Sequence, residues 1–407
     1  MVPTSSESRT TLITLIGRDR PGVTTRIFSV LHRFCSEVID VEQVVIRGQL
    51  ILGVLVSEPS DPKGLLRALE SEAAELGVSV EVAGGVGDNR SRSKGRSLVT
   101  VLGRPLSASV MAALSGRIAD IGANIDRIVR MARYPVTAIE MHVSGADPAA
   151  LRELLTREAV TLRVDVAVQP DGMIRQAARL IVMDVDSTLV QGEVIEMLAA
   201  HAGCADEVRQ VTEAAMRGEI DFEQSLRQRV ALLQGLDAAA LDTVHDALQL
   251  APGARTLVRS LKRLGYRFAI VSGGFSQITE RLAQELGIDY AKANTLEIVD
   301  GKLTGRVVGD VIDRAGKATA LQEFADASGI PLSATVAIGD GANDLEMLSA
   351  AGLGIAFNAK PLVREQADTS VNVPYLDTIL YLLGISREDV EEADEAAGYV
   401  TPAPPLT

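Results

Sequence analysis

The spacing of hydrophobic residues divides the chain into two kinds of region. In the first 170 residues or so, short apolar runs of strand length alternate with segments that have the spacing of an amphipathic helix. Their order is strand, helix, strand, strand, helix, strand, and this order occurs twice. From Leu180 to about Leu383, strands and helices alternate one by one. The pattern predicts two small α+β modules followed by a doubly wound parallel sheet.

The two modules predict an internal duplication. TLITLIGRDRPGV, which begins at Thr11, matches SLVTVLGRPLSASV, which begins at Ser97, in its strand, its glycine and its loop length. A segment rich in Gly, Ser and charge, residues 83–96, lies between the copies and is predicted to be a linker. We therefore expect ferredoxin-like βαββαβ modules at residues 9–84 and 97–170.

The alternating region predicts a Rossmann-like α/β domain at residues 178–385. Buried parallel strands are predicted for three apolar runs: Leu180–Met183, Arg267–Val271 and Thr335–Ile338. A polar-patterned helical segment, about residues 192–250, follows the first strand and is predicted to form a cap over the site. The acidic and then Pro-rich segment 386–407 is predicted to be mobile.

Composition narrows the class of protein. The net charge of −14 argues against a nucleic-acid binder that relies on a basic surface. No stretch reaches the ~20 apolar residues of a membrane span, and the N-terminus lacks the apolar core of a signal peptide. Cys35 and Cys204 have no nearby cysteine partner, so we expect reduced thiols. The sequence predicts a soluble, cytoplasmic protein without nucleic-acid or membrane partners.

The motif DVDST places two carboxylates at the end of the first strand of the α/β domain. Asp184 and Asp186 are two residues apart, so in an extended chain their side chains point to the same side. The C-terminal edge of a parallel sheet is where such folds bind ligands. Carboxylate pairs at this edge suit Mg²⁺, which takes oxygen ligands and leaves room for a phosphate. Alone, the motif equally suits a turn whose aspartates cap the backbone.

Three further motifs follow DVDST. They are VSGGF at Ser272, a lysine at Lys317 in DRAGKATAL, and GDGAND at Asp340. The four motifs together are strongly specific for one protein family, whereas each alone is a weak signal. In order and context the four motifs resemble those of the haloacid dehalogenase superfamily of phosphotransferases. Separately, SGG is more often a simple turn, and a lysine at the start of a helix is usually a solvated surface residue.

The resemblance implies a role for each motif in phosphoryl transfer. Asp184 would attack phosphorus and form an aspartyl-phosphate, which divides one difficult displacement into two easier steps. Asp186 would protonate the leaving alkoxide and later deprotonate the hydrolytic water. Lys317 would neutralise charge on the transferring group.

The same resemblance implies a phosphate cradle and a metal site. Ser272 and the backbone N–H groups of Gly273 and Gly274 would hold phosphate oxygens, and Asn343 would bond the phosphate or the metal. The implied Mg²⁺ ligands are Asp184, Asp186 through its backbone carbonyl, and Asp340, with Asp344 in the first or second coordination shell.

The sequence of the predicted cap narrows the range of possible substrates. Its strings GEVIEMLA and AMRGEIDFEQSLRQRVALL resemble those of the phosphoserine phosphatases, a branch of the superfamily. The resemblance implies that Glu193 receives the substrate ammonium and Arg229 its carboxylate, with Met216 and Phe222 on the apolar side. Arg offers a two-pronged donor for a carboxylate. Arg227 is the rival for that role, and individually the Met and the Phe suit an ordinary cap core.

Both N-terminal modules resemble the ACT domain, which binds amino acids in metabolic enzymes. The first copy carries the DRPG loop, whereas the second has PLSA in its place. The first has Val38 where the family has an Asn, and the second retains one. The resemblance implies an effector site for L-serine shared by the copies, within a two-fold homodimer. Its residues would be Gly17, Asp19, Gly22, Val23 and Asn124. The alternative is a dimerisation scaffold without a ligand.

Taken together, the sequence predicts Mg²⁺-dependent hydrolysis of O-phospho-L-serine, the last step of L-serine biosynthesis, regulated by L-serine. One alternative keeps the chemistry and changes the substrate to phosphothreonine or a sugar phosphate. The other is an amino-acid sensor that has lost turnover. Such a sensor is expected to lack one of the residues needed for catalysis, and all of them are present.

Overall fold

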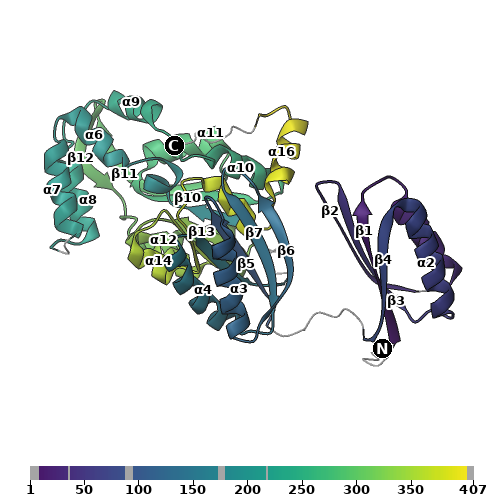
Figure 1. Ribbon diagram of the computed structural model, residues 1–407. Coiled ribbons are helices and arrows are strands. Elements are labelled where there is room, and N and C mark those ends of the chain that lie inside the picture. The colour runs from purple at the N-terminus through teal and green to yellow at the C-terminus, as the bar shows by residue number, and fades with distance from the viewer. Residues whose placement is uncertain (1–8, 35–36, 88–94, 173–178, 217–218, 401–407) are drawn as a thin grey trace. The chain divides into compact units, whose positions relative to one another are not determined.

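The computed structural model describes residues 9–34, 37–87, 95–172, 179–216 and 219–400, which form two compact units, residues 1–91 and 92–407 (Figure 1). Three predictions concern residues outside the described ranges: the thiol of Cys35, residues 88–94 of the predicted linker, and the terminal segment 401–407. The linker prediction is wrong for residues 83–86, which continue strand β4 (Val78–Val86) and pair with β1 (Arg9–Arg18).

The first unit is one βαββαβ module. Its four antiparallel strands lie in the order β2-β3-β1-β4, and helices α1 and α2 cover one face (Figure 1). Apolar residues of the central strands, such as Ile13 and Leu52, alternate toward these helices and are fully buried. The elements are β1 Arg9–Arg18, α1 Val23–Arg33, β2 Val38–Ile46, β3 Gln49–Ser57, α2 Pro62–Leu76 and β4 Val78–Val86.

The second unit begins with a module of the same topology. Its sheet order, β6-β7-β5-β8, matches the order of the first module, which confirms the predicted pair of ferredoxin-like folds. Helices α3 and α4 cover one face. The elements are β5 Ser97–Gly103, α3 Ala108–Asp120, β6 Asn124–Ala132, β7 Thr137–Ser144, α4 Pro148–Leu162 and β8 Asp165–Pro170.

The other face of the second module packs on the rest of the unit. Leu102 and Ala138 belong to the same apolar core as Tyr375 and Leu380. Buried Asp165 accepts hydrogen bonds from the backbone N–H and side-chain amide of Asn372, at 2.7 and 2.6 Å. The module is therefore joined to the larger α/β domain by both apolar packing and paired polar groups.

The α/β domain is built on a seven-stranded sheet of order β12-β11-β10-β9-β13-β14-β15. The three predicted strands are confirmed as β9 Leu180–Met183, β10 Arg267–Phe275 and β13 Thr335–Gly339, and β9 lies between the other two. They pair in parallel, so their C-terminal ends share one edge. The remaining strands are β11 Tyr290–Val299, β12 Lys302–Val308, β14 Leu353–Phe357 and β15 Thr369–Val371.

Helices flank this sheet on both faces, and four more form the predicted helical cap (Figure 1). The cap helices are α6 Val194–Ala202, α7 Ala205–Met216, α8 Phe222–Ala231 and α9 Ala239–Ala247. The main sheet-covering helices are α10 Ala254–Arg263, α11 Ser276–Leu286, α12 Arg314–Ser328 and α13 Leu345–Ala350, and shorter helices are α14 Pro361–Gln366 and α15 Ile379–Leu382.

The prediction of a mobile segment from residue 386 onward is wrong for residues 386–399. They contain helix α16, Arg387–Ala396, which begins with a capping box at Ser386. Val390 enters the main core, and fully buried Asp394 accepts hydrogen bonds from Arg259 and Arg263. The prediction treated every acidic residue of this segment as a solvated charge. Asp394 is instead a buried partner of an internal ion pair.

Candidate active site

The C-terminal ends of β9, β10 and β13 converge on one cavity. Asp184 follows β9, Gly273 lies near the end of β10, and Asp340 follows β13. The cavity has a volume of about 510 Å³, and its lining includes all three residues together with cap residues. It also includes Asp186, as the two-residue spacing predicts. The sheet and the cap therefore enclose a space suited to a small polar molecule.

Beneath the cavity, Lys317 holds two carboxylates together. Its Nζ donates hydrogen bonds to Asp184 Oδ1 and to Asp344 Oδ1, both at 2.6 Å. All three side chains are buried. Lys317 lies in the first turn of α12, and Asp344 precedes α13, so two helices fix the ammonium and one carboxylate against the end of β9.

A glycine lets this cluster close. A Cβ added to Gly339 would lie 2.4 Å from the carboxyl carbon of Asp344, which is too close for any side chain. The second oxygen of Asp344 accepts the Gly341 N–H at 2.9 Å. The glycines of GDGAND thus serve the approach of Asp344 to Lys317, in addition to ending the strand.

Asp186 is fixed by two donors on the cavity wall. Its Oδ1 accepts the Val194 N–H at 2.9 Å, at the start of helix α6, and its Oδ2 accepts the Ser272 hydroxyl at 2.9 Å. Ser272 is fully buried, and its oxygen accepts the Gly274 N–H at 2.7 Å. The carboxylate is therefore oriented by the cap on one side and, on the other, by residues 272–274 near the end of β10, which we call the β10 loop.

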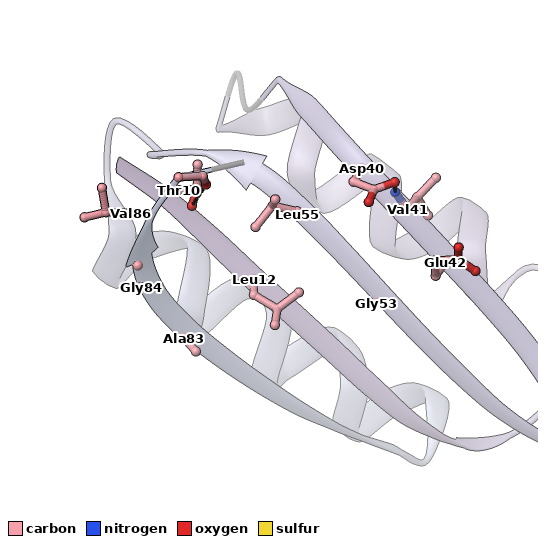
Figure 2. A pocket seen from close by; sticks show the side chains of 12 residues that line it. Thr10, Leu12, Asp40, Val41, Glu42, Gly53, Leu55, Ala83, Gly84 and Val86 are labelled. Atoms are coloured by element: carbon pink, nitrogen blue, oxygen red, sulfur yellow. Dashed lines mark hydrogen bonds between the residues drawn. The ribbon is translucent and has the colours of Figure 1, made fainter. Parts of the chain in front are cut away.

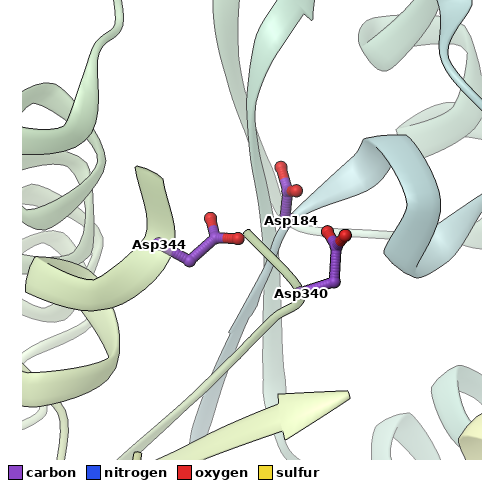
Figure 3. A group of neighbouring side chains, drawn as sticks. All are labelled: Asp184, Asp340 and Asp344. Carbon is purple, nitrogen blue, oxygen red and sulfur yellow. The ribbon is translucent and has the colours of Figure 1, made fainter. Parts of the chain in front are cut away.

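Three carboxylates form a candidate metal centre. Oxygens of Asp184, Asp340 and Asp344 all lie within 4.8 Å of one another, and Figure 3 shows the three side chains grouped together. Carboxylate oxygens without nitrogen or sulfur donors fit a hard divalent cation. The ligands predicted from the family resemblance were Asp184, Asp186 through its backbone carbonyl, and Asp340, with Asp344 in the first or second coordination shell. The side chain of Asp186 makes the hydrogen bonds described above, and its backbone contact with the metal stays a prediction.

The electrostatics of this cluster also fit a cation. Burial and the charge of Asp344 raise the pKa of Asp184 well above its usual range, against the opposing effect of Lys317. Burial and the charge of Asp344 also raise the pKa of Asp340, to about 6. Burial lowers the pKa of Lys317, but the charges of Asp184 and Asp344 outweigh it and raise that pKa overall. Negative charge in the cluster exceeds what one lysine neutralises.

The opposite wall carries the two predicted substrate-binding charges. Glu193, at the N-terminus of α6, and Arg229, in the last turn of α8, both line the cavity. Arg227 lies instead on the solvent side of α8, where it pairs with Glu223 at 2.7 Å. Burial lowers the pKa of Arg229. Burial and the charges of Asp186 and Asp340 raise the pKa of Glu193 to about 7, although its side chain is open toward the cavity.

Phe222 forms the apolar side of the cavity, at the first position of α8. The ring lies directly against the backbone of Gly273 in β10. A Cβ added to this glycine would lie only 2.9 Å from the ring carbon Cζ. The side chain of Met216 lies outside the described residues. Asn343 lines the cavity, and its bond to the phosphate or the metal stays a prediction. Ser272 and Lys317 lie behind its wall, bonded to Asp186 and Asp184 respectively.

Three residues near the site escaped the sequence analysis. Asn294, buried in β11, donates to the Gly273 carbonyl at 2.8 Å and accepts the Ile312 N–H at 2.7 Å. It thereby connects the β10 loop to the segment that enters α12. Glu196 and Lys360 line the cavity. The rule that ligands bind at strand ends would have suggested Lys360, which follows β14.

The predicted effector residues belong to both units. Gly22 has a positive φ of 94° and precedes α1, whose N-terminus has no side-chain cap. The Asp19 N–H donates to the Gly48 carbonyl at 2.8 Å. Asn124, in the second unit, is exposed at the start of β6 and donates to Asp126 at 2.7 Å. The structure describes each half alone, so the shared site stays a prediction.

Comparison with family models identifies three matching regions. Residues 181–349 match the haloacid dehalogenase-like hydrolases. Residues 9–83 and 96–169 each match an ACT domain model. Within the described ranges, no helix combines the length and apolar character needed to cross a bilayer.

Similar proteins match over nearly the whole chain. A phosphoserine phosphatase from Streptomyces coelicolor is 60% identical over 97% of this chain and 96% of its own length. One from Mycobacterium tuberculosis is 53% identical over 94% and 95%. Among solved structures, a probable phosphoserine phosphatase from Vibrio cholerae is 34% identical with a TM-score of 0.57, covering 74% of this chain and 88% of that one.

Proposed function

The chain belongs to the phosphoserine phosphatases of the haloacid dehalogenase-like hydrolase family, and on this basis we propose that it hydrolyses O-phospho-L-serine to L-serine and phosphate. The supporting observation is the division of the cavity wall. Asp184 and Asp186 lie at the sheet end, and the opposite charges of Glu193 and Arg229 lie on the cap. A substrate with phosphate at one end and a zwitterion at the other matches this arrangement.

The chemistry proceeds in two steps. An ionised oxygen of Asp184 attacks phosphorus and forms an aspartyl-phosphate, while the bond from phosphorus to the serine oxygen breaks. Asp186 donates the proton that the leaving oxygen needs. It then accepts a proton from water, which attacks phosphorus, releases phosphate and regenerates Asp184. Lys317, fixed against Asp184, stabilises the negative charge of the phosphoryl group.

Mg²⁺ is the proposed cofactor. Asp184 and Asp340 would hold it directly, together with the backbone carbonyl of Asp186, and Asp344 lies in the same carboxylate group. When bound, the ion would favour the ionised carboxylates and neutralise phosphate charge. Asp344 supports this arrangement through Lys317 and the Gly341 N–H.

Phosphate release tests the proposal. The full chain should release phosphate from O-phospho-L-serine with Mg²⁺, and EDTA should abolish release until Mg²⁺ is restored. Binding of phosphoserine without release under both conditions would support the sensor instead. Efficient release from glycerol phosphate alone would support a different small phosphate ester as substrate.

We also propose that L-serine is the effector and that the protein is a cytoplasmic homodimer associating through its ACT domains. In the shared site, N–H groups near Gly22 and Val23 bind the carboxylate, and Asp19 and Asn124 take the ammonium. Gly17 is the penultimate residue of β1, just before this loop. The support is the division of the motif between the two copies: the first keeps the loop and the second the Asn.

Calorimetric titration with L-serine, on wild type, Asp19→Ala and Asn124→Ala, tests the shared site. Both substitutions should weaken binding. Binding unaffected by either would contradict it and leave a scaffold without this ligand.

A further inference from the structure

The charged side chains that line the active-site cavity are mostly acidic. Five carboxyl groups line it: Asp184, Asp186, Glu193, Glu196 and Asp340. Among the lining residues that the structure describes, Arg229 and Lys360 are the basic ones. The substrate proposed above brings a phosphate group with nearly two negative charges into this cavity. An anion that approaches so many carboxylates is drawn in only where cations offset them.

Of the cations at the site, Lys360 is the one without a role so far. Lys317 lies behind the wall, 1% exposed, and its Nζ donates to two carboxylates. Arg229 belongs to the cap, where it is proposed to pair with the substrate carboxylate. Lys360 is exposed, and its ammonium forms no hydrogen bond or ion pair with any residue that the structure describes. Its charge is therefore available to an incoming anion.

The strand topology places Lys360 next to the candidate metal centre. β14 pairs in parallel with β13, with Ala356 opposite Gly339, so the loops that follow the two strands leave the same edge of the sheet. One loop begins with Asp340, and the other carries Lys360. Lys360 therefore reaches the cavity from the sheet, where the phosphate is transferred, whereas Arg229 reaches it from the cap.

The backbone around Lys360 is held on both sides. Before it, the Asn358 N–H donates to the Val371 carbonyl at 2.8 Å, and the side chain of Ala359 is buried. After it, Pro361 begins α14 and restricts the backbone of Lys360 to its extended conformation. A long, exposed side chain thus extends from a fixed position on the cavity wall.

We propose that Lys360 binds the phosphate group of the substrate on entry and the phosphate product before release. A lysine ammonium is a compact charge on a flexible stem, so it can follow an anion without a fixed geometry. Lys317, held by two carboxylates, acts on the transferring group instead. Lys360 therefore contributes to binding rather than to the chemical step. The inference rests on the proposed function, in that the substrate must be a phosphate ester.

The cavity of the first module shows the opposite balance of charge. It has a volume of about 410 Å³ and lies on the face of the sheet away from the helices (Figure 2). Its charged lining residues are Asp40 and Glu42, and none of its described lining residues is basic. A phosphate group finds no cation there, so binding of inorganic phosphate to the full chain does not involve this cavity.

Kinetics of Lys360→Met test the proposal, because methionine removes the charge and keeps an unbranched stem. With O-phospho-L-serine and Mg²⁺, KM should rise about tenfold and kcat should stay within about twofold of wild type, since uniform binding affects KM alone. The inhibition constant of inorganic phosphate should rise by a similar factor. Lys360→Arg keeps the charge and should restore both constants to within about threefold of wild type.

Arg364→Met is the matched control. Arg364 lies one turn further along α14, where it donates to Asn372 at 3.3 Å, and it is not among the described residues that line the cavity. Its loss removes the same charge and should leave KM and phosphate inhibition unchanged. Added NaCl should raise KM of the wild type more steeply than KM of Lys360→Met, because salt screens the attraction that the variant lacks.

Hydrolysis of p-nitrophenyl phosphate separates this inference from the identity of the substrate. This ester shares only its phosphate group with phosphoserine, so Lys360→Met should raise KM for both esters by the same factor. A chain that hydrolyses p-nitrophenyl phosphate but not phosphoserine would refute the proposed function and leave the role of Lys360 measurable. An unchanged KM for both esters, a change confined to phosphoserine, or an equal effect of Arg364→Met would overturn the role of Lys360.

Discussion

At the scale of single residues, the site depends on a buried lysine that keeps two acids in place. Lys317 is 1% exposed and remains charged because Asp184 and Asp344 both accept from its Nζ. Without it, the two buried carboxylates would repel each other. The ammonium therefore orients Asp184, the proposed nucleophile, and neutralises charge at the same time.

Asp184→Asn should remove catalysis and keep the fold. The amide retains the shape of the carboxylate and its bond to Lys317, but it presents no ionised oxygen to phosphorus. We expect kcat for phosphate release to fall by orders of magnitude, about 10³-fold or more. Circular dichroism should show an unchanged melting profile. A variant that keeps more than about a tenth of wild-type kcat would exclude Asp184 as nucleophile.

The raised pKa of Glu193 predicts a pH dependence of substrate binding. With a pKa of about 7, the free carboxyl gains a proton as pH falls below 7 and can no longer pair with the substrate ammonium. KM for phosphoserine should therefore rise as pH falls from 8 to 6. In Glu193→Gln, KM should be high throughout and nearly flat with pH. An unchanged pH profile of KM in this variant would assign the titration to another group.

The sequence identifies these residues unequally. Asp184, Asp186 and Asp340 follow apolar runs, so their convergence at one sheet edge is predictable from strand geometry. Lys317 was identified only through the family resemblance, because a lysine in a first helical turn is ordinarily solvated. The choice of Arg229 over Arg227 also rested on the resemblance, since both are basic residues of one helix. No sequence motif marks Asn294 as important. Its two hydrogen bonds join segments that are distant in the sequence and meet only in the folded chain.

At the scale of elements, β11 supports the site from one strand away. Buried Asn294 bonds the Gly273 carbonyl of the β10 loop and the Ile312 N–H before α12. The β10 loop orients Asp186, and α12 carries Lys317. One amide thus sets the spacing between two catalytic elements.

Asn294→Ala should lower kcat more than it changes KM. It leaves a buried carbonyl and a buried N–H unpaired, each costing about 1–3 kcal/mol, and loosens the spacing of Asp186 and Lys317. We expect a decrease in kcat of about ten- to a hundredfold. Gln277→Ala is the control, since Gln277 bonds the backbone of Leu296 on the same strand but away from the site. Equal losses in both variants would indicate general destabilisation of β11.

Helix α16 illustrates why element prediction from composition has limits. Its acidic residues suggested a solvated tail, yet Asp394 is fully buried between Arg259 and Arg263 of α10. The capping box at Ser386 was the available signal of a helix start. Whether an acidic residue such as Asp394 is buried or solvated depends on tertiary packing, which the local sequence does not reveal.

At the scale of the whole molecule, duplication produced two modules with different surroundings. The topology was predictable because the hydrophobic pattern repeats. The different surroundings were not predictable, because Leu12 and Leu98 are the same residue type, although Leu12 is exposed and Leu98 is buried. On the same strand as Leu98, Leu102 joins the core of the catalytic domain. What covers a sheet face is decided by partners elsewhere in the chain or in another copy.

We propose that the cap recognises the zwitterion of phosphoserine while the end of the sheet performs the phosphoryl transfer. The most direct test is the ratio of kcat/KM for O-phospho-L-serine to that for glycerol phosphate, in wild type, Arg229→Ala and Arg227→Ala. Arg227 is the matched control because it lies two residues away and pairs with Glu223 on the solvent side.

Loss of the pair between Arg229 and the substrate carboxylate should cost about 2–5 kcal/mol for phosphoserine alone. The ratio should therefore strongly favour phosphoserine in wild type and in Arg227→Ala, and it should fall at least thirtyfold in Arg229→Ala. An equal loss of activity on both substrates in Arg229→Ala, with the ratio unchanged, would contradict this proposal.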